Sequence, residues 1–156
     1  MSTIEAKADA LKKSKAEEFA NACPSRVIEM ALEDLEAVER SPKYQVVMED
    51  CHRPSDYGYC VVCLGGAVIA NRLGGSPSQK LLFDSYEDGG WGDEECARLS
   101  ALDCFRQGLV GAALDYFGIG NAPLGDRAPI TPYHLNPDSF KLSLRHLIVM
   151  LKRGGL

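Results

Sequence analysis

The sequence has no apolar run long enough to cross a membrane and no segment typical of a secretory signal. Its longest stretch without a charged residue, 57–71, has 15 residues, whereas a membrane-spanning helix needs about 20. The N-terminal stretch MSTIEAKADALKKSKAEEF carries charges throughout, and signal peptides require an uninterrupted apolar region. These absences predict a cytoplasmic protein that does not bind membranes and whose six cysteines are reduced.

Catalytic and nucleotide-binding motifs are also missing. There is no Ser-centred elbow, no phosphate-binding glycine loop and no HExxH. The three histidines, His52, His134 and His146, stand in unrelated contexts. The net charge of -5 and the lack of a basic, aromatic-interleaved stripe argue against direct nucleic-acid binding. We therefore expect that the protein is not an enzyme and binds no cofactor. The alternative is an enzyme whose active site is assembled from residues distant in sequence.

Hydrophobic periodicity predicts a mainly α fold, with α+β as the alternative. The 156 residues suit one domain, 1–156, of about five helices. The segments with helical spacing are 3–22, 25–40, 57–72, 93–117 and a last one beginning at Asn136-Pro137. Segments 43–50 and 80–86 favour strands and predict a short two-stranded ribbon.

Four details of these helices carry further expectations. The first helix, within 1–22, has a thin apolar face and should be peripheral. Glu29, Glu33 and Glu36 line one side of the second helix, which we expect to be solvated. Gly65-Gly66 in the third predicts close packing of another element. Gly108 and Gly111 mark where the fourth helix could bend or split.

Cys60 and Cys63 in DYGYCVVCLGG have the spacing of a redox pair or of half a zinc site. The βαβ pattern of a thioredoxin-like centre does not surround them, and no second CxxC closes a zinc site. We expect both to be buried packing residues. The alternative is a small zinc-binding protein whose ligands would be drawn from Cys51, His52, Cys60 and Cys63.

The acidic stretch DSYEDGGWGDEE surrounds the single tryptophan of the chain, Trp91. It partly matches an EF-hand loop beginning at Asp84, but Tyr86 occupies the third position, where a carboxylate is expected. An aromatic anchor among charges is typical of protein-binding surfaces, whereas a solvated turn is the structural alternative. The predicted partner-binding residues are Trp91 with Asp84, Glu87, Asp88, Asp93, Glu94 and Glu95.

Residues 31–70 resemble a set of small proteins encoded by phages and prophages. The segments ALEDLEAVERSPKYQ and YGYCVVCLGGAVIA are similar to the AL…SGxYxQ and YCCLGVLC segments of that set, with Pro42 in place of a glycine. The resemblance implies a phage-type accessory protein acting in the cytoplasm of a bacterial host cell. We expect it to bind a host protein with a basic surface, for example to inhibit a defence system as anti-CRISPR proteins do.

Overall fold

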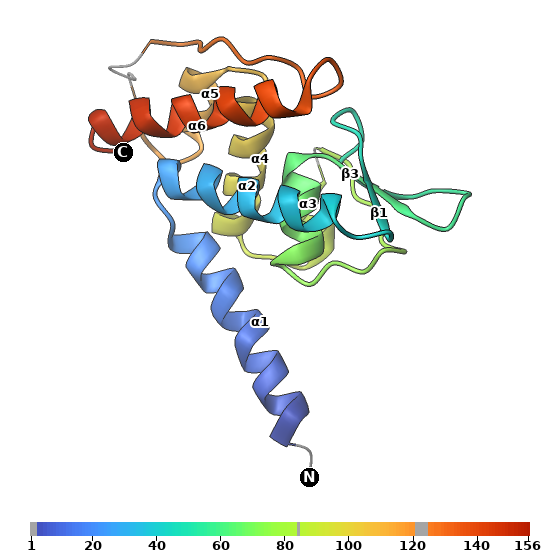
Figure 1. The fold of residues 1–156 in the computed structure, drawn as a ribbon. Helices are drawn as coiled ribbons and strands as arrows, with labels where there is room; N and C mark the ends of the chain where they lie inside the picture. The colour runs from blue at the N-terminus through green and yellow to red at the C-terminus, as the bar shows by residue number, and fades with distance from the viewer. Residues whose placement is uncertain (1–2, 84, 121–124) are drawn as a thin grey trace.

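The structure is a computed structural model that describes residues 3–83, 85–120 and 125–156. It confirms a mainly α fold with a small sheet (Figure 1). The helices are α1 (Thr3–Asn21), α2 (Pro24–Glu39), α3 (Leu64–Asn71), α4 (Asp93–Arg106), α5 (Val110–Asp115) and α6 (Pro137–Arg153), with a 3₁₀ turn η1 (Tyr86–Gly89). The strands are β1 (Tyr44–Val46), β2 (His52–Pro54) and β3 (Cys60–Val62).

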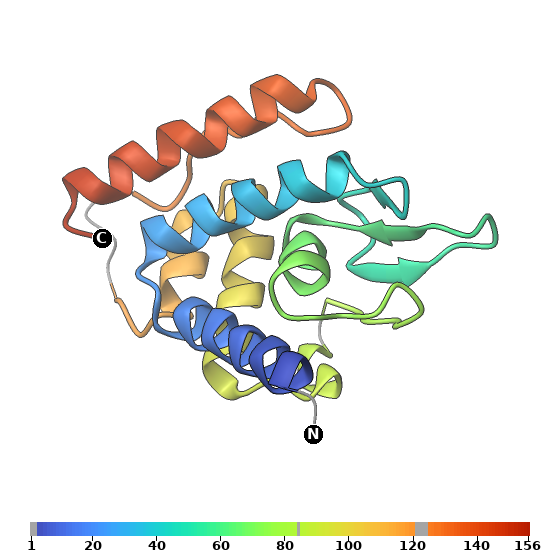
Figure 2. The same cartoon turned by 60° about the horizontal axis from the view of Figure 1, so that its bottom comes forward.

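Helix α2 is the centre of the fold. It packs against α3, α4, α6 and β1, and Figure 2 shows it between α6 and the remaining helices. The stripe that the sequence predicts as its inner face is buried, as expected: Ile28, Ala31, Leu32, Leu35 and Val38. Pro24 occupies the first turn, where a missing backbone N–H costs nothing.

Asp34 is a fully buried acid on α2, and it joins α2 to the C-terminal end of α3. Its carboxylate accepts hydrogen bonds from Asn71 Nδ2 at 2.7 Å and from Arg72 Nε at 2.9 Å. Burial raises the pKa of Asp34, and the hydrogen bonds from Arg72 and Asn71 offset part of that effect. A buried carboxylate needs such partners, because desolvation alone would cost several kcal/mol.

The acidic side of α2 is solvated only in part, because Glu29 and Glu36 contact α6, whereas Glu33 is exposed as the sequence suggested. Lys152 Nζ lies 2.9 Å from Glu29 and Arg145 Nη2 lies 3.0 Å from Glu36. Lys141 pairs with Glu39 in the same way, and Glu33 binds Arg72 and Arg26. For Glu29 and Glu36 the expectation failed because their basic partners come from α6, more than 100 positions away along the chain. We call the three contacts of Glu29, Glu36 and Glu39 with α6 the α2–α6 ladder.

The sheet differs from the expected ribbon. Its strand order is β1-β3-β2, with β1 parallel and β2 antiparallel to β3. The predicted helix over 57–72 is wrong in its first half, because residues 60–62 form β3 and the helix begins at Leu64. Val61 and Val62 are β-branched and favour a strand. Among the described residues of segment 80–86, only Leu81 is bridged to the sheet, through His52.

The long helical segment 93–117 is split into α4 and α5. Gly108 adopts a positive φ of 78°, which side chains rarely tolerate. A methyl group there would also collide with the carbonyl oxygen of Ala128. The backbone of the irregular segment after α5 therefore lies directly against Gly108.

Helix α1 is peripheral, as predicted. Its described residues are exposed from Thr3 to Lys15, and only its last turns reach the core, through Ala16 and Phe19. Its C-terminal part packs against α4, and its N-terminal part projects away from the rest of the molecule (Figure 1). None of the described helices combines the length and apolarity needed to span a membrane.

The two adjacent glycines of α3 provide a matched test of the packing. A methyl group on Gly66 would overlap the carbonyl oxygen of Cys51, whereas one on Gly65 would meet the Tyr86 hydroxyl at 3.4 Å, an ordinary contact. We expect Gly66→Ala to destabilise the protein by about 2 kcal/mol or more. Gly65→Ala should be neutral or slightly stabilising, because alanine is the better helix former. Urea unfolding of both variants measures this, and equal effects would contradict the packing at α3.

Candidate functional site

The cysteine and histidine residues around β3 are buried and form two separate pairs. Cys60 Sγ lies 3.7 Å from His52 Nδ1, and that nitrogen also contacts the Gln79 carbonyl oxygen at 2.6 Å. The thiol of Cys51 is hydrogen-bonded to that of Cys63. Cys63 also caps α3, since its Sγ accepts the Gly66 N–H at 3.3 Å.

These two pairs do not form the zinc site that the sequence left as an alternative. Positions three apart on one helix face share a side, but Cys60 lies in β3 and Cys63 follows it, so they point to opposite faces. Among the described residues, no three His, Cys, Asp or Glu side chains come together in a way that could hold a metal ion. The expected burial of Cys60 and Cys63 is confirmed, with 0% and 1% exposed.

The electrostatics of these pairs favour neutral groups. Burial raises the pKa of the Cys60 thiol and lowers the pKa of His52. The hydrogen bond with Cys63, together with burial, raises the pKa of Cys51. A thiol reacts as its thiolate, so Cys60 and Cys51 are suited to packing. Cys63 is the exception, because although burial opposes this, the hydrogen bonds from Cys51 and from the Gly66 N–H lower the pKa of its thiol. Its side chain is 1% exposed, which keeps reagents away from it.

The predicted partner-binding carboxylates gather on η1 and the first turn of α4. Glu87, Asp88, Asp93 and Glu94 are exposed and Glu95 is half-buried, whereas Asp84 lies outside the described residues. We call the five described residues the acidic surface. The preceding residues 72–83 contain no helix, so the entering helix of an EF-hand is missing there. No Lys, Arg or His forms an ion pair with the acidic surface within the part of the chain that the structure describes.

Trp91 is neither fully displayed nor buried. The sequence around Trp91, with a glycine on either side and carboxylates nearby, favours an indole displayed to a partner. The structure corrects this, because the side chain is half-buried and packs against the core. The indole lies over Gly89, where a methyl group would overlap its six-membered ring. Gly89 thus provides the space for the ring to fold back.

A hollow of about 470 Å³ opens beside the acidic surface. Its walls are aromatic rings and small polar groups, and two of its lining residues, Glu87 and Asp93, belong to the acidic surface. The other described lining residues are Phe83, Tyr86, Cys96, Ala97, Ser100 and Tyr116. Tyr86 is buried and directs its hydroxyl toward Gly65 and Cys51, so it contributes its ring to the hollow and not its polar group.

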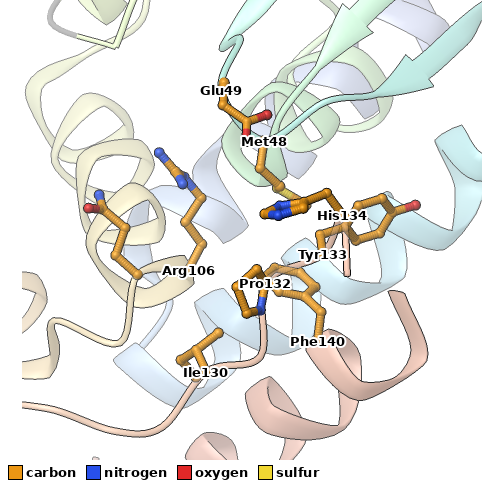
Figure 3. Close-up of a pocket in the computed structure, with 9 residues that line it drawn as sticks. Met48, Glu49, Arg106, Ile130, Pro132, Tyr133, His134 and Phe140 are labelled. Atoms are coloured by element: carbon orange, nitrogen blue, oxygen red, sulfur yellow. The ribbon is translucent and has the colours of Figure 1, made fainter. Parts of the chain in front are cut away.

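A second hollow, of about 360 Å³, was not predicted from the sequence (Figure 3). It brings together residues from the β1–β2 connection, the end of α4, the irregular segment and α6: Met48, Glu49, Arg106, Gln107, Ile130, Pro132, Tyr133, His134 and Phe140. No short motif joins these four segments, so periodicity and spacing gave no signal for it.

Two of the polar side chains that line this second hollow already have partners within the protein. Arg106 is already neutralised by Asp103, with Nη2 at 2.7 Å, and lies over the Phe83 ring at 5.3 Å. The Tyr133 hydroxyl donates to Glu39 at 2.6 Å, and in Figure 3 it points away from His134. Among the described residues that line it there is no Ser, Cys or Lys nucleophile. The arrangement offers a polar recess that also contains the side chains of Glu49 and His134.

Comparison of the chain with protein-family models, with curated proteins and with solved structures found no match in any of the three.

Thiol labelling tests the assignment of the cysteine pairs as packing residues. Cys23 is exposed, and its hydrogen bond with Ser25 lowers the pKa of its thiol. We expect Cys23 to react first with a thiol reagent in the folded protein, and Cys51, Cys60 and Cys63 to react only after unfolding. Mass spectrometry identifies the labelled sites, and Cys23→Ser should remove the fast phase. Stoichiometric zinc in the purified protein, or labelling of Cys60 before Cys23, would contradict this assignment.

Proposed function

We propose that this protein is a non-enzymatic accessory factor of phage or prophage type, which binds a host protein through the acidic surface and modulates or inhibits it. Its place of action would be the cytoplasm of a bacterial host cell, and its partner would present a basic surface. Inhibition of a defence system, in the manner of anti-CRISPR proteins, is the concrete form of the proposal. The observation that carries it is the set of five carboxylates without a cationic partner among the described residues.

The acidic surface contrasts with the other carboxylates of the chain. On α2, Glu29, Glu33 and Glu36 each have a basic partner within 4 Å. The dipole of α4 favours Asp93, Glu94 and Glu95 in its first turn, but it does not relieve the repulsion from Glu87 and Asp88. A basic partner would relieve this repulsion on binding, and complementary charge also speeds encounter.

The hollow beside the acidic surface supports the same kind of partner. A lysine or arginine side chain that enters it would meet the carboxylates of Glu87 and Asp93 and the rings of Phe83 and Tyr116. Carboxylates and aromatic faces both attract cations. The half-buried Trp91 would add apolar contact of the kind that dominates binding energy. The resemblance of residues 31–70 to phage-encoded proteins supports the cellular setting.

Charge neutralisation at the hollow tests the proposal. The protein would be immobilised and incubated with bacterial lysate, and each retained protein would be quantified by mass spectrometry. We expect Glu87→Gln/Asp93→Asn to reduce retention of the specific partner about tenfold, as the loss of two charge-assisted contacts implies. The control variant Asp56→Asn/Asp126→Asn changes the net charge by the same amount at exposed positions elsewhere. It should retain the partner as the wild-type protein does. Retention that does not differ between the two variants would contradict the assignment.

Trp91 provides the second test, because it is the only tryptophan. Since the indole is half-buried, Trp91→Ala should destabilise the fold modestly, by about 1 kcal/mol, and should weaken partner binding. In the wild-type protein, the emission maximum should shift when the captured partner is added, and the shift should decline with added salt. An emission spectrum unchanged by the bound partner would move the binding surface away from Trp91.

A further inference from the structure

Helix α6 carries a short outer stripe of two exposed apolar side chains on the side that faces away from the core, with the exposed Arg145 and His146 between them. Its inner face buries Phe140, Leu144, Leu147, Ile148 and Leu151. On the outer face, Leu142 and Val149 are 65% and 45% exposed. They are seven residues apart, and positions seven apart on a helix differ in direction by about 20°. Leu135, 70% exposed, lies just before the helix and extends the same spacing.

Two unpaired charges flank this stripe, one at each end. Asp138 lies four residues before Leu142, and Arg153 lies four residues after Val149, so both share the face of the stripe. Both are exposed, and neither forms an ion pair within the described ranges of the chain. The neighbouring basic residues of α6 differ, because Lys141, Arg145 and Lys152 are engaged in the α2–α6 ladder.

We propose that the outer face of α6 binds the same face of a second copy of this chain in an antiparallel pair. A two-fold axis between Arg145 and His146 sets Leu142 against Val149 of the second copy. The same register sets Asp138 against Arg153 of the second copy, so one arrangement pairs the two apolar residues and the two unpaired charges. It also sets Arg145, whose charge is paired with Glu36, against His146 of the second copy. Such a self-complementary contact is the usual form of a homodimer interface.

Charge complementarity selects the antiparallel orientation. In a parallel pair, Asp138 would face Asp138 of the other copy and Arg153 would face Arg153, and the helix dipoles would also repel each other. Since one helix face contributes only a few apolar side chains, the contact is smaller than a standard interface. The dimer should therefore be weak, with a dissociation constant on the order of micromolar.

The dimer surface is independent of the proposed acidic surface. In Figure 2, α6 runs along the top, and the yellow-green segment that contains η1 lies at the bottom. Partner binding and dimerisation would therefore not compete, and a dimer would carry two acidic surfaces.

Sedimentation equilibrium over a range of protein concentrations tests the apolar contact. We expect the mass of the wild-type protein to rise toward that of two chains, and Leu142→Glu or Val149→Glu to remain monomeric. Leu82→Glu is the matched control, since Leu82 is 56% exposed and lies outside α6. All three replace exposed residues, so their melting temperatures should stay close to that of the wild type. A monomer at every concentration, or a dimer that Leu142→Glu does not affect, would overturn the proposal.

Charge reversal tests the orientation. Asp138→Arg and Arg153→Asp should each weaken dimerisation about tenfold, because two symmetric pairs become repulsive. The double variant should restore it to within about threefold of the wild type. This rescue cannot come from a more stable monomer, because both changes oppose the dipole of α6. Failure of the double variant to recover would exclude the antiparallel register.

Discussion

The burial of α2 on several sides at once is the constraint on which the remaining fold depends. A helix surrounded by α3, α4, α6 and β1 leaves few places for polar side chains, and each must find a partner. Asp34 meets this requirement through Arg72 and Asn71 at the end of α3. Removing Arg72 would leave a buried carboxylate with only part of its compensation. The contact between Asp34 and Arg72 thus fixes where α3 ends. It thereby also fixes the position of β3, and of the thiols that follow it, relative to α2.

Carboxylates play two different parts on this molecule. Glu29, Glu36 and Glu39 on α2 pair with basic residues of α6, the long C-terminal helix whose apolar face packs on the core. Those on η1 and α4 form no ion pair among the described residues, although Arg98 lies near Glu94 and Glu95. They lie beside a hollow lined by aromatic rings. The net charge of -5 is therefore unevenly distributed. This asymmetry, and not the total charge, is what supports recognition of a basic partner.

The features that could be read from the sequence were those that a single periodic segment determines. The inner stripe of α2, the Asn136 cap of α6 and the peripheral position of α1 are of this kind. The first half of segment 57–72 was predicted wrongly because the segment is apolar on every side, so its hydrophobic pattern shows neither the helical nor the strand period. The β-branched Val61 and Val62 favour the strand that forms there. The α2–α6 ladder and the hollow around Arg106 and His134 join residues distant along the chain. The acidic stretch was visible from composition, but the fold of Trp91 over Gly89 depends on local backbone geometry.

The α2–α6 ladder also restricts which substitutions the two helices can accept. Glu36 with Arg145, Glu39 with Lys141 and Glu29 with Lys152 are separated by about a hundred positions, yet each pair spans one contact between the same two helices. A reversal of charge in one helix would place like charges side by side, while a matching reversal in the other would restore the attraction. Related chains that keep this helix pair should therefore change these positions together, and such covariation would mark the two helices as neighbours without any structure.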